Sequence, residues 1–285
     1  MPEILRRPAY AKVNLILEVL GVRSDGYHEI DTVLQEIELA DIVEVRAAQD
    51  WSITVSGPRS RGVPSDDSNL ALKAAQCLAK RVDGHPVAVH LEKHIPAAGG
   101  LGGGASDAVA VLKLLALLWP NATSNDLLAV ANDIGSDEAF FLVGGTARAQ
   151  GRGERVTPLP SLGPHGVVLF IPPSTIERKT ARMFGALDKH PFDDGEVVQN
   201  FVSDRTTRIA AESVFNGFER VAFDLFPWLA ALWSDLEQRT GSAIRLAGAG
   251  PCLFWTGPPG EARSLAEAAR GANCEVIVTK TATRP

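Results

Sequence analysis

The chain has 285 residues, of which 45% are hydrophobic and 22% are charged, and its formal net charge at pH 7 is −6. This composition is typical of a globular protein with a full hydrophobic core and argues against a disordered or fibrous chain. The acidic balance, without a concentrated basic patch, disfavours nucleic-acid binding, although a few local lysines and backbone amides suffice to hold one anionic ligand.

The cysteines and the N-terminal segment indicate the compartment. Cys77, Cys252 and Cys274 are widely spaced and form no C-x-x-C pair, which favours reduced thiols over a disulfide framework or a zinc site. The first residues lack the basic-then-apolar layout of a signal peptide, and no stretch reaches the roughly 18 apolar residues that a membrane-spanning helix needs. We therefore expect a cytoplasmic protein without membrane partners; whether it is a monomer or a homodimer stays open.

In the first half of the chain, strands precede helices. Apolar and β-branched runs predict short strands at residues 13–19, 32–39, 42–46, 51–55 and 87–91. Helical spacing of apolar residues predicts helices at residues 69–82, 108–119 and 123–134. Pro120 ends the second of these helices, and Thr123 with Asp126 forms a capping-box pattern at the start of the third.

The second half follows a stretch with several prolines and glycines, residues 158–166, which indicates a linker. Beyond it we predict strands at residues 167–171, 243–246, 252–255 and 275–279. Helices are predicted at about residues 177–188, 205–215, 226–240 and 261–270. Because helices or a tight glycine turn separate these strands, the pattern favours an α+β sandwich. The whole chain is therefore expected to be α+β, with two domains at residues 1–160 and 161–285.

The segment PAAGGLGGGAS, residues 96–106, is the strongest local signal in the sequence. Its glycines let the backbone approach a ligand closely and aim several N–H groups at one point, and the helix that follows adds its positive N-terminal end. No lysine follows the glycines, which excludes a Walker loop, and a dinucleotide fingerprint fits only weakly. A ligand-free turn is the remaining alternative, but so many glycines cost backbone entropy, so a triphosphate site is favoured.

Together with this loop, further stretches carry a family resemblance. They are residues 8–15 (PAYAKVNL), 21–28 (GVRSDGYH), 134–154 with its GSD and GRGE motifs, and the late glycine turn 246–252 (LAGAGPC). In this order the chain resembles the GHMP kinase superfamily, named after galactose, homoserine, mevalonate and phosphomevalonate kinases. It is most similar to the branch that phosphorylates a hydroxyl of a cytidine diphosphate-linked polyol in non-mevalonate isoprenoid biosynthesis.

The resemblance implies an N-terminal domain like domain 2 of ribosomal protein S5 and a ferredoxin-like α/β sandwich as the C-terminal domain. It also implies ATP as co-substrate, with Mg²⁺ to neutralise charge on the phosphates. Alternatives are another small-molecule kinase of the mevalonate or homoserine type, and a non-catalytic sensor that keeps the fold. The Gly-Tyr-His turn disfavours the former, and retention of both Lys12 and Asp137 disfavours the latter.

Two residues are implied to be catalytic. Lys12 would offset negative charge on the transferring phosphate, although a lone lysine at a strand start is more often a solvated edge residue. Asp137 would accept or position the substrate hydroxyl proton, although an aspartate beside Gly and Ser is commonly a turn residue. Glu138 stands where the family usually has valine. It adds a second carboxylate, which either repels Asp137 or joins the Mg²⁺ shell.

The remaining site residues are implied by the same resemblance. The ATP-binding residues would be Pro96, Ala97, Ala98, Gly99, Gly100, Leu101, Gly102, Gly103, Gly104, Ala105, Ser106, Asn69 and Lys93. The substrate-binding residues would be Asn14, Tyr27, His28, Thr180 and Phe184, with Tyr27 stacking on cytosine and His28 reading its edge. A helix cap is equally plausible for Asn69, and so is a solvated charge for Lys93. A phenylalanine in the position of Phe184 is more often a core residue than a ligand contact. Ser106 suits a helix cap, a phosphate contact or a Mg²⁺ contact.

Two further departures from the family pattern concern the second half. The late turn has Ala247 and Ala249 where hydroxyl residues are usual, so hydroxyl contacts to a ligand are lost while the backbone turn can survive. Gly217 replaces a usual aspartate in the stretch Asn216–Glu219, which we interpret as structural.

Overall fold

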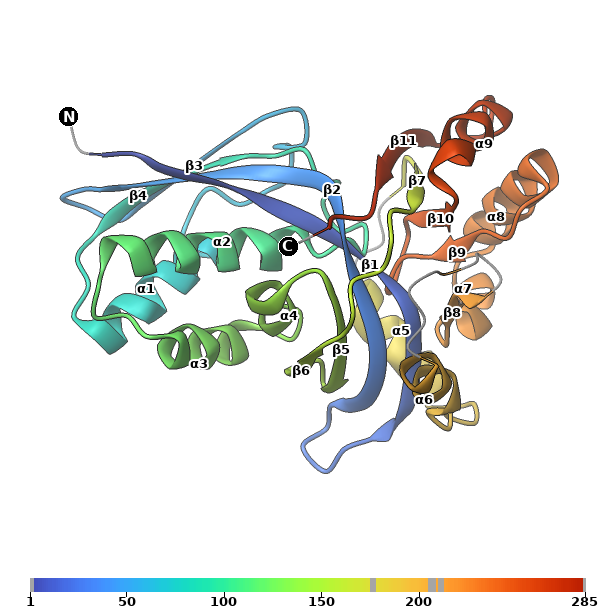
Figure 1. Cartoon of the computed structure of the whole chain (residues 1–285), viewed down its shortest axis with the longest axis horizontal. Helices are drawn as coiled ribbons and strands as arrows, with labels where there is room; N and C mark the ends of the chain where they lie inside the picture. The colour runs from blue at the N-terminus through green and yellow to red at the C-terminus, as the bar shows by residue number, and fades with distance from the viewer. Residues whose placement is uncertain (1–2, 175–177, 205–208, 210–212, 284–285) are drawn as a thin grey trace. The chain divides into compact units, whose positions relative to one another are not determined.

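The computed structural model describes residues 3–174, 178–204, 209 and 213–283 (Figure 1). The first half of the chain contains β1 (Leu5–Val22), β2 (His28–Ala47), β3 (Ser52–Ser56), α1 (Leu70–Val82), β4 (Val87–Glu92), α2 (Gly103–Leu118), α3 (Ser124–Ile134), α4 (Glu138–Val143), β5 (Thr146–Gly151) and β6 (Arg155–Pro158). The second half contains β7 (Gly166–Ile171), α5 (Lys179–Leu187), α6 (Glu196–Ser203), β8 (Phe215–Asn216), α7 (Glu219–Leu225), α8 (Pro227–Thr240), β9 (Arg245–Leu246), β10 (Leu253–Gly257), α9 (Ala262–Ala268) and β11 (Glu275–Lys280). The helix predicted at residues 205–215 lies largely outside the described residues.

Two compact units interleave along the sequence. Unit 1 comprises Met1–Ala11, Leu39–Ala97 and Gly102–Val143. Unit 2 comprises Lys12–Glu38, Ala98–Leu101 and Gly144–Pro285. The long strands β1 and β2 therefore continue from one unit into the other, and so does the glycine-rich loop. The single domain boundary after residue 160 stays a prediction.

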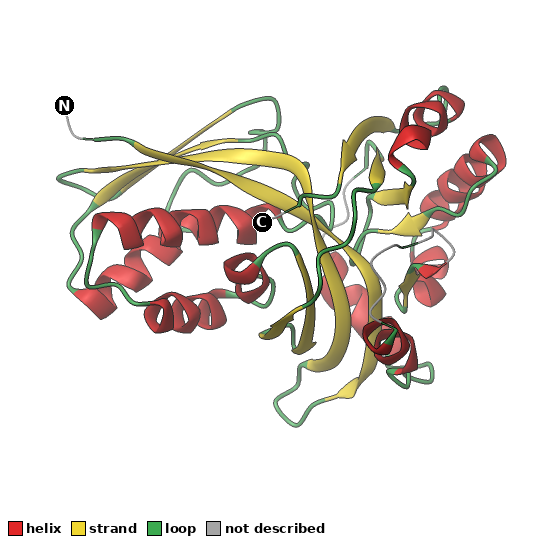
Figure 2. Ribbon diagram, in the orientation of Figure 1, coloured by secondary structure: helices red, strands yellow, loops and turns green. Residues whose placement is uncertain are grey.

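Unit 1 is a layer of helices on a small sheet. The C-terminal half of β2 pairs antiparallel with β4, and β3 pairs parallel with β4. Helices α1, α2 and α3 lie on one face of these strands (Figure 2). Alternate residues of β4 are buried, which gives the sheet an apolar face, and this face forms the core with the helices. The predicted capping box of α3 is confirmed, with Thr123 and Asp126 bonded reciprocally.

Unit 2 contains two groups of strands. The N-terminal half of β2 pairs with β5, β5 pairs with β6, and β1 pairs with the short strand β8. A separate four-stranded antiparallel sheet has the order β11-β7-β10-β9, and α9 packs beside it (Figure 1). Apolar side chains of this sheet, of β1 and of α5, α7, α8 and α9 form one core. Together the units confirm the α+β class.

The structure differs from the predicted elements in two respects. Residues 32–39 and 42–46 belong to one strand, β2, rather than to two. The short elements α4, α6, α7, β5 and β6 were not predicted. None of the helices in the described ranges is both long and apolar enough to cross a membrane.

Candidate active site

The glycine-rich loop has a backbone suited to anions. Ala98, Gly100 and Gly102 have positive φ angles of 55°, 87° and 74°, so left-handed residues alternate along the loop. Such alternation turns successive N–H groups toward one concave point, the arrangement known as an anion-binding nest. Helix α2 begins directly afterwards, with Gly102 as its N-cap. Ser106 is therefore not the cap, and its phosphate and Mg²⁺ contacts stay predictions.

Within unit 2, the late glycine turn lies against the same loop. A Cβ atom on Gly100 would lie 2.0 Å from the carbonyl oxygen of Ala247, so only glycine fits there. The Cys252 N–H donates to the carbonyl of Gly99 at 3.3 Å. Lys179, which the sequence did not single out, donates from Nζ to the carbonyls of Ala98 at 2.6 Å and of Gly250. The loop is thus held from the late turn and from α5.

The structure buries Lys12, which lies inside β1 with 4% of its surface exposed. Its N–H donates to the carbonyl of Leu101 in the glycine-rich loop at 2.9 Å. Its Nζ donates to Oδ1 of Asn14 at 2.8 Å, and Nδ2 of Asn14 donates to Oγ1 of Thr32 at 2.9 Å. The solvated edge position is therefore wrong for Lys12.

The stretch Asn216–Glu219 supports the late turn, as its structural interpretation requires. Nδ2 of Asn216 donates to the carbonyls of Leu246 and Gly248 at 2.9 and 2.8 Å. Oε1 of Glu219 accepts from the Leu246 N–H at 3.0 Å. Burial raises the pKa of Glu219 to about 7, because the charged carboxylate loses hydration. The turn is therefore fixed by side chains from β8 and α7.

In unit 1, Lys93 is 3% exposed and forms ion pairs with Asp41 and Asp107. It is therefore not the solvated charge given as one alternative. Asp41 also accepts from the Ile95 N–H at 2.8 Å, while Asp107 lies in the first turns of α2. Burial raises the pKa of Asp107, and the charge of Lys93 opposes this shift. The trio attaches both flanks of the glycine-rich loop to β2.

Asn69 caps α1, since its side chain accepts from the Ala71 N–H at 2.9 Å. Its Nδ2 also donates to the carbonyl of Pro64 at 2.7 Å. The helix-cap alternative is therefore correct for Asn69. Contacts of Asn69 and Lys93 with adenine stay predictions.

Asp137 and Glu138 differ in exposure. Asp137 is half-buried in unit 1, immediately before α4, whereas Glu138 is 2% exposed. The Glu138 carboxylate lies against Gly135, where a Cβ atom would come within 2.1 Å of Oε2. Among the described residues no group of three or more His, Cys, Asp or Glu side chains forms a metal cage. Two adjacent carboxylates still fit Mg²⁺ in a kinase, since this ion takes its other ligands from phosphates and water.

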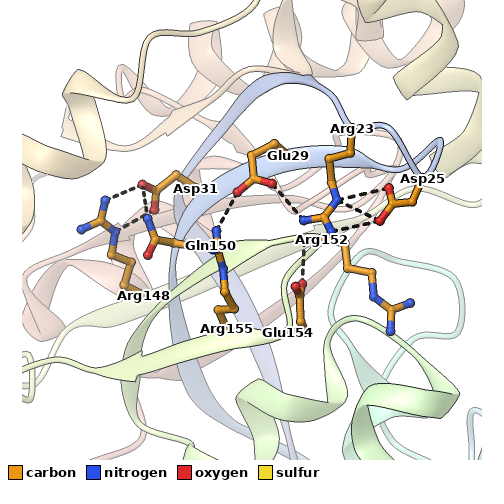
Figure 3. Close-up of polar contacts among 9 residues, drawn as sticks. All are labelled: Arg23, Asp25, Glu29, Asp31, Arg148, Gln150, Arg152, Glu154 and Arg155. Carbon is orange, nitrogen blue, oxygen red and sulfur yellow. Dashed lines mark hydrogen bonds and ion pairs between the residues drawn. The ribbon is translucent and has the colours of Figure 1, made fainter.

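Tyr27 lies in the turn that joins β1 to β2, and His28 is the first residue of β2. An ion pair connects Glu29, at the start of β2, with Arg155, at the start of β6 (Figure 3). Glu29 accepts from Arg23 at 2.9 Å and from Arg155 at 2.7 Å. Tyr27 is 52% exposed, and the guanidinium carbon of Arg152 lies 5.2 Å from its ring centroid. One face of an exposed aromatic ring is thus supported by a cation.

His28 faces α5, also within unit 2. Its ring stacks on Phe184 with centroids 4.3 Å apart and an interplanar angle of 17°. Its Nε2 lies 2.8 Å from Oδ1 of Asp188. Thr180 is exposed one turn before Phe184. The structure therefore brings His28 and Phe184 together, while Asp188 was missed because nothing in the local sequence links it to a histidine 160 residues away.

Comparisons with known proteins agree with this arrangement. A family model described as "GHMP kinases N terminal domain" matches residues 69–145, and one described as "GHMP kinases C terminal" matches residues 203–275. The chain is 35% identical over 285 residues to a protein of Exiguobacterium sibiricum named 4-diphosphocytidyl-2-C-methyl-D-erythritol kinase, covering 98% of each chain. It is 39% identical to a protein of Dehalococcoides mccartyi with the same name, covering 86% of this chain and 87% of the relative.

Solved structures show the same fold. A crystal structure of 4-(cytidine 5'-diphospho)-2C-methyl-D-erythritol kinase has a TM-score of 0.78 and 32% identity, covering 98% of this chain and 100% of the other. A homoserine kinase from Cytophaga hutchinsonii has a TM-score of 0.71 at 17% identity, covering 99% and 96%. The latter likeness shows the fold alone.

Proposed function

Because this chain belongs to the GHMP kinase family, we propose that it transfers the γ-phosphate of ATP to the 2-hydroxyl of 4-diphosphocytidyl-2-C-methyl-D-erythritol. The products are ADP and the 2-phosphate, an intermediate of non-mevalonate isoprenoid biosynthesis. Similarity to kinases of this name over nearly the whole chain supports the proposal. The observation that carries it is the nest at Ala98, Gly100 and Gly102, whose alternating backbone suits a polyphosphate. A cytoplasmic location stays a prediction.

The loop amides would bind the phosphate oxygens of ATP. Residues 96–106 supply N–H groups, and the N-terminal end of α2 adds positive potential. Mg²⁺ neutralises negative charge on the phosphates during phosphoryl transfer, and Asp137 and Glu138 would hold it. Because the transition state is loose, positioning and charge stabilisation by these groups account for most of the rate enhancement.

Lys12 would stabilise the transferring phosphate. Its ammonium is oriented by Asn14, which is itself held by Thr32. A preorganised cation needs no rearrangement as negative charge develops on the oxygens, so its effect is larger than that of a mobile surface lysine. Asn14 would also hold the hydroxyls of the polyol, since it shares the strand face of Lys12.

Asp137 would act on the acceptor. Its carboxylate orients the 2-hydroxyl and takes its proton as the phosphate arrives. The cytidine end of the substrate would be bound by Tyr27, His28 and Phe184, with Thr180 lining the same pocket. Aromatic rings offer a stacking surface to cytosine, and the imidazole offers a hydrogen bond to its edge.

Two substitutions test the proposal in an assay of ADP release with the diphosphocytidyl polyol. The wild type should release ADP only when this acceptor is present. Lys12→Met and Asp137→Asn should each lower kcat by roughly 10²-fold or more, because each removes charge stabilisation or general-base help. Lys80→Met, at an exposed position in α1, is the matched control for loss of a lysine and should retain full activity.

Circular dichroism and thermal unfolding show whether the variants stay folded. Turnover near the wild-type rate in folded Lys12→Met or Asp137→Asn removes that residue from the mechanism. Absence of ADP release by the wild type with this acceptor contradicts the proposed function itself.

A further inference from the structure

The contacts of His28 restrict its chemistry. Its Nε2 lies 2.8 Å from Oδ1 of Asp188, and its ring is stacked on Phe184. Phe192 approaches the same ring edge-on, with centroids 6.3 Å apart. The side chain of His28 is 11% exposed, whereas that of Asp188 is 44% exposed. The imidazole is thus held in one plane, and one of its nitrogens is committed to a carboxylate.

A carboxylate can only accept, so the nitrogen that faces Asp188 carries the proton. In a neutral imidazole the other nitrogen then has a lone pair and accepts hydrogen bonds. No described residue bonds to Nδ1 of His28, so within the described part of the chain this acceptor has no hydrogen bond. Asp188 therefore determines which hydrogen-bonding edge His28 presents.

We propose that Asp188 is a positioning residue that makes His28 select cytosine over uracil. This inference rests on the proposed function, in which His28 reads the edge of the base. Cytosine carries an amino group at position 4, which donates to Nδ1. Uracil carries a carbonyl oxygen at that position, and its lone pair repels the lone pair of Nδ1. A fixed acceptor thus favours one base and disfavours the other.

One helix supplies both constraints on the ring. Phe184 and Asp188 are four residues apart, and the Asp188 N–H donates to the carbonyl of Phe184 at 3.1 Å, so both side chains lie on one face of α5 and its cap. Tyr27 is supported independently, by the guanidinium of Arg152 in the turn between β5 and β6. Changing Asp188 should therefore alter the tautomer of His28 and leave the turn between β1 and β2 intact.

The test compares the diphosphocytidyl polyol with its diphosphouridyl analogue. Wild type should prefer cytidine, and Asp188→Asn should lower this preference by about tenfold or more, because an amide can donate to Nε2 and move the proton to Nδ1. The loss should come from a higher KM for the polyol, with the KM for ATP unchanged. Asp188→Glu keeps a carboxylate and should retain more of the preference. Asp224→Asn, at an exposed position of α7, is the matched control.

Nitrogen-15 NMR of labelled histidine gives a second readout that a merely structural role would not move. In the wild type the signals should show a protonated Nε2 and an unprotonated Nδ1 in His28, and Asp188→Asn should shift this distribution. If the wild type prefers cytidine and Asp188→Asn prefers it equally, the role of Asp188 is overturned and the proposed function is not. A wild type with Nδ1 protonated has the same consequence. A wild type that does not prefer cytidine overturns both this inference and the cytidine substrate of the proposed function.

Discussion

At the scale of single residues, buried charges were the hardest feature to predict. Lys12 and Lys93 both look like strand-end surface lysines in the sequence, yet both are buried. Lys12 is compatible with the interior because Asn14, two residues away, accepts its hydrogen bond. Lys93 is compatible because of Asp41 and Asp107, which lie 52 and 14 residues away. Local periodicity carries no information about such partners, so only the family resemblance identified these lysines as site residues.

Gly100 makes the clearest prediction at this scale. Alanine there would place Cβ 2.0 Å from the Ala247 carbonyl and would keep a φ of 87° that side chains rarely adopt. We expect Gly100→Ala to raise the Kd for a non-hydrolysable ATP analogue by about tenfold or more, since the loop must move to relieve the clash. Titration calorimetry measures this change.

Gly62→Ala is the matched control. Gly62 has a similar φ of 79°, but a Cβ atom there would meet nothing within 4 Å. It should therefore show only the cost of the left-handed conformation, roughly 1–2 kcal/mol in the free energy of unfolding, with unchanged nucleotide affinity. Equal affinity of the two variants for the ATP analogue contradicts a role of Gly100 in shaping the nest.

At the scale of elements, length and regular patterning decided what was predictable. The periodic helices α1, α2 and α8 were predicted to within a few residues, apart from the N-terminal end of α2. Elements as short as α4, with 6 residues, are too short to show a period. The false break in β2 falls at Asp41, a charged residue inside an apolar run. The strand continues there because Lys93 pairs with Asp41, which no local rule reveals.

Glu219 attaches α7 to the late turn, and its raised pKa predicts that the free energy of unfolding depends on pH. Burial raises the pKa of Glu219 from 4.5 to about 7, so its protonated form is favoured in the folded state. The contribution of the protonated Glu219 side chain to the free energy of unfolding is fully present below pH 4.5. It is lost as the pH rises to about 7. Glu219→Gln keeps an acceptor for the Leu246 N–H and cannot ionise. As the pH rises across this range, the free energy of unfolding of the wild type should therefore fall relative to that of Glu219→Gln, by up to about 3 kcal/mol.

Urea unfolding at pH 4.5, 6 and 8 measures the difference. Glu267→Gln, an exposed position in α9, is the control and should follow the wild type at every pH. Parallel pH profiles for the wild type and Glu219→Gln contradict the assignment of a raised pKa to this buried carboxylate.

At the scale of the whole molecule, the sequence identified the family and the α+β class, because motifs in a fixed order extend over both halves of the chain. It did not reveal which segments meet. The contact of Gly99 with Cys252, and that of His28 with Asp188, join positions more than 150 residues apart. These contacts arise from tertiary packing within unit 2. Lys179 and Asp188 were not predicted for the same reason, because their partners lie far from them in the sequence.

At this scale the proposed function depends on which acceptor molecule the enzyme phosphorylates. A homoserine kinase at 17% identity shares this fold. The aromatic group of Tyr27, His28 and Phe184 suits a nucleobase, which neither mevalonate nor homoserine contains. A competition between acceptors therefore separates the proposed function from other members of the family.

The most direct measurement is kcat/KM for phosphorylation of 4-diphosphocytidyl-2-C-methyl-D-erythritol, mevalonate and homoserine, with ATP and Mg²⁺ present throughout. We predict a preference of roughly 10²-fold or more for the diphosphocytidyl polyol, because a site built to bind a base leaves its polar groups unpaired with the other two acceptors. An equal or higher value for mevalonate or homoserine would contradict the account.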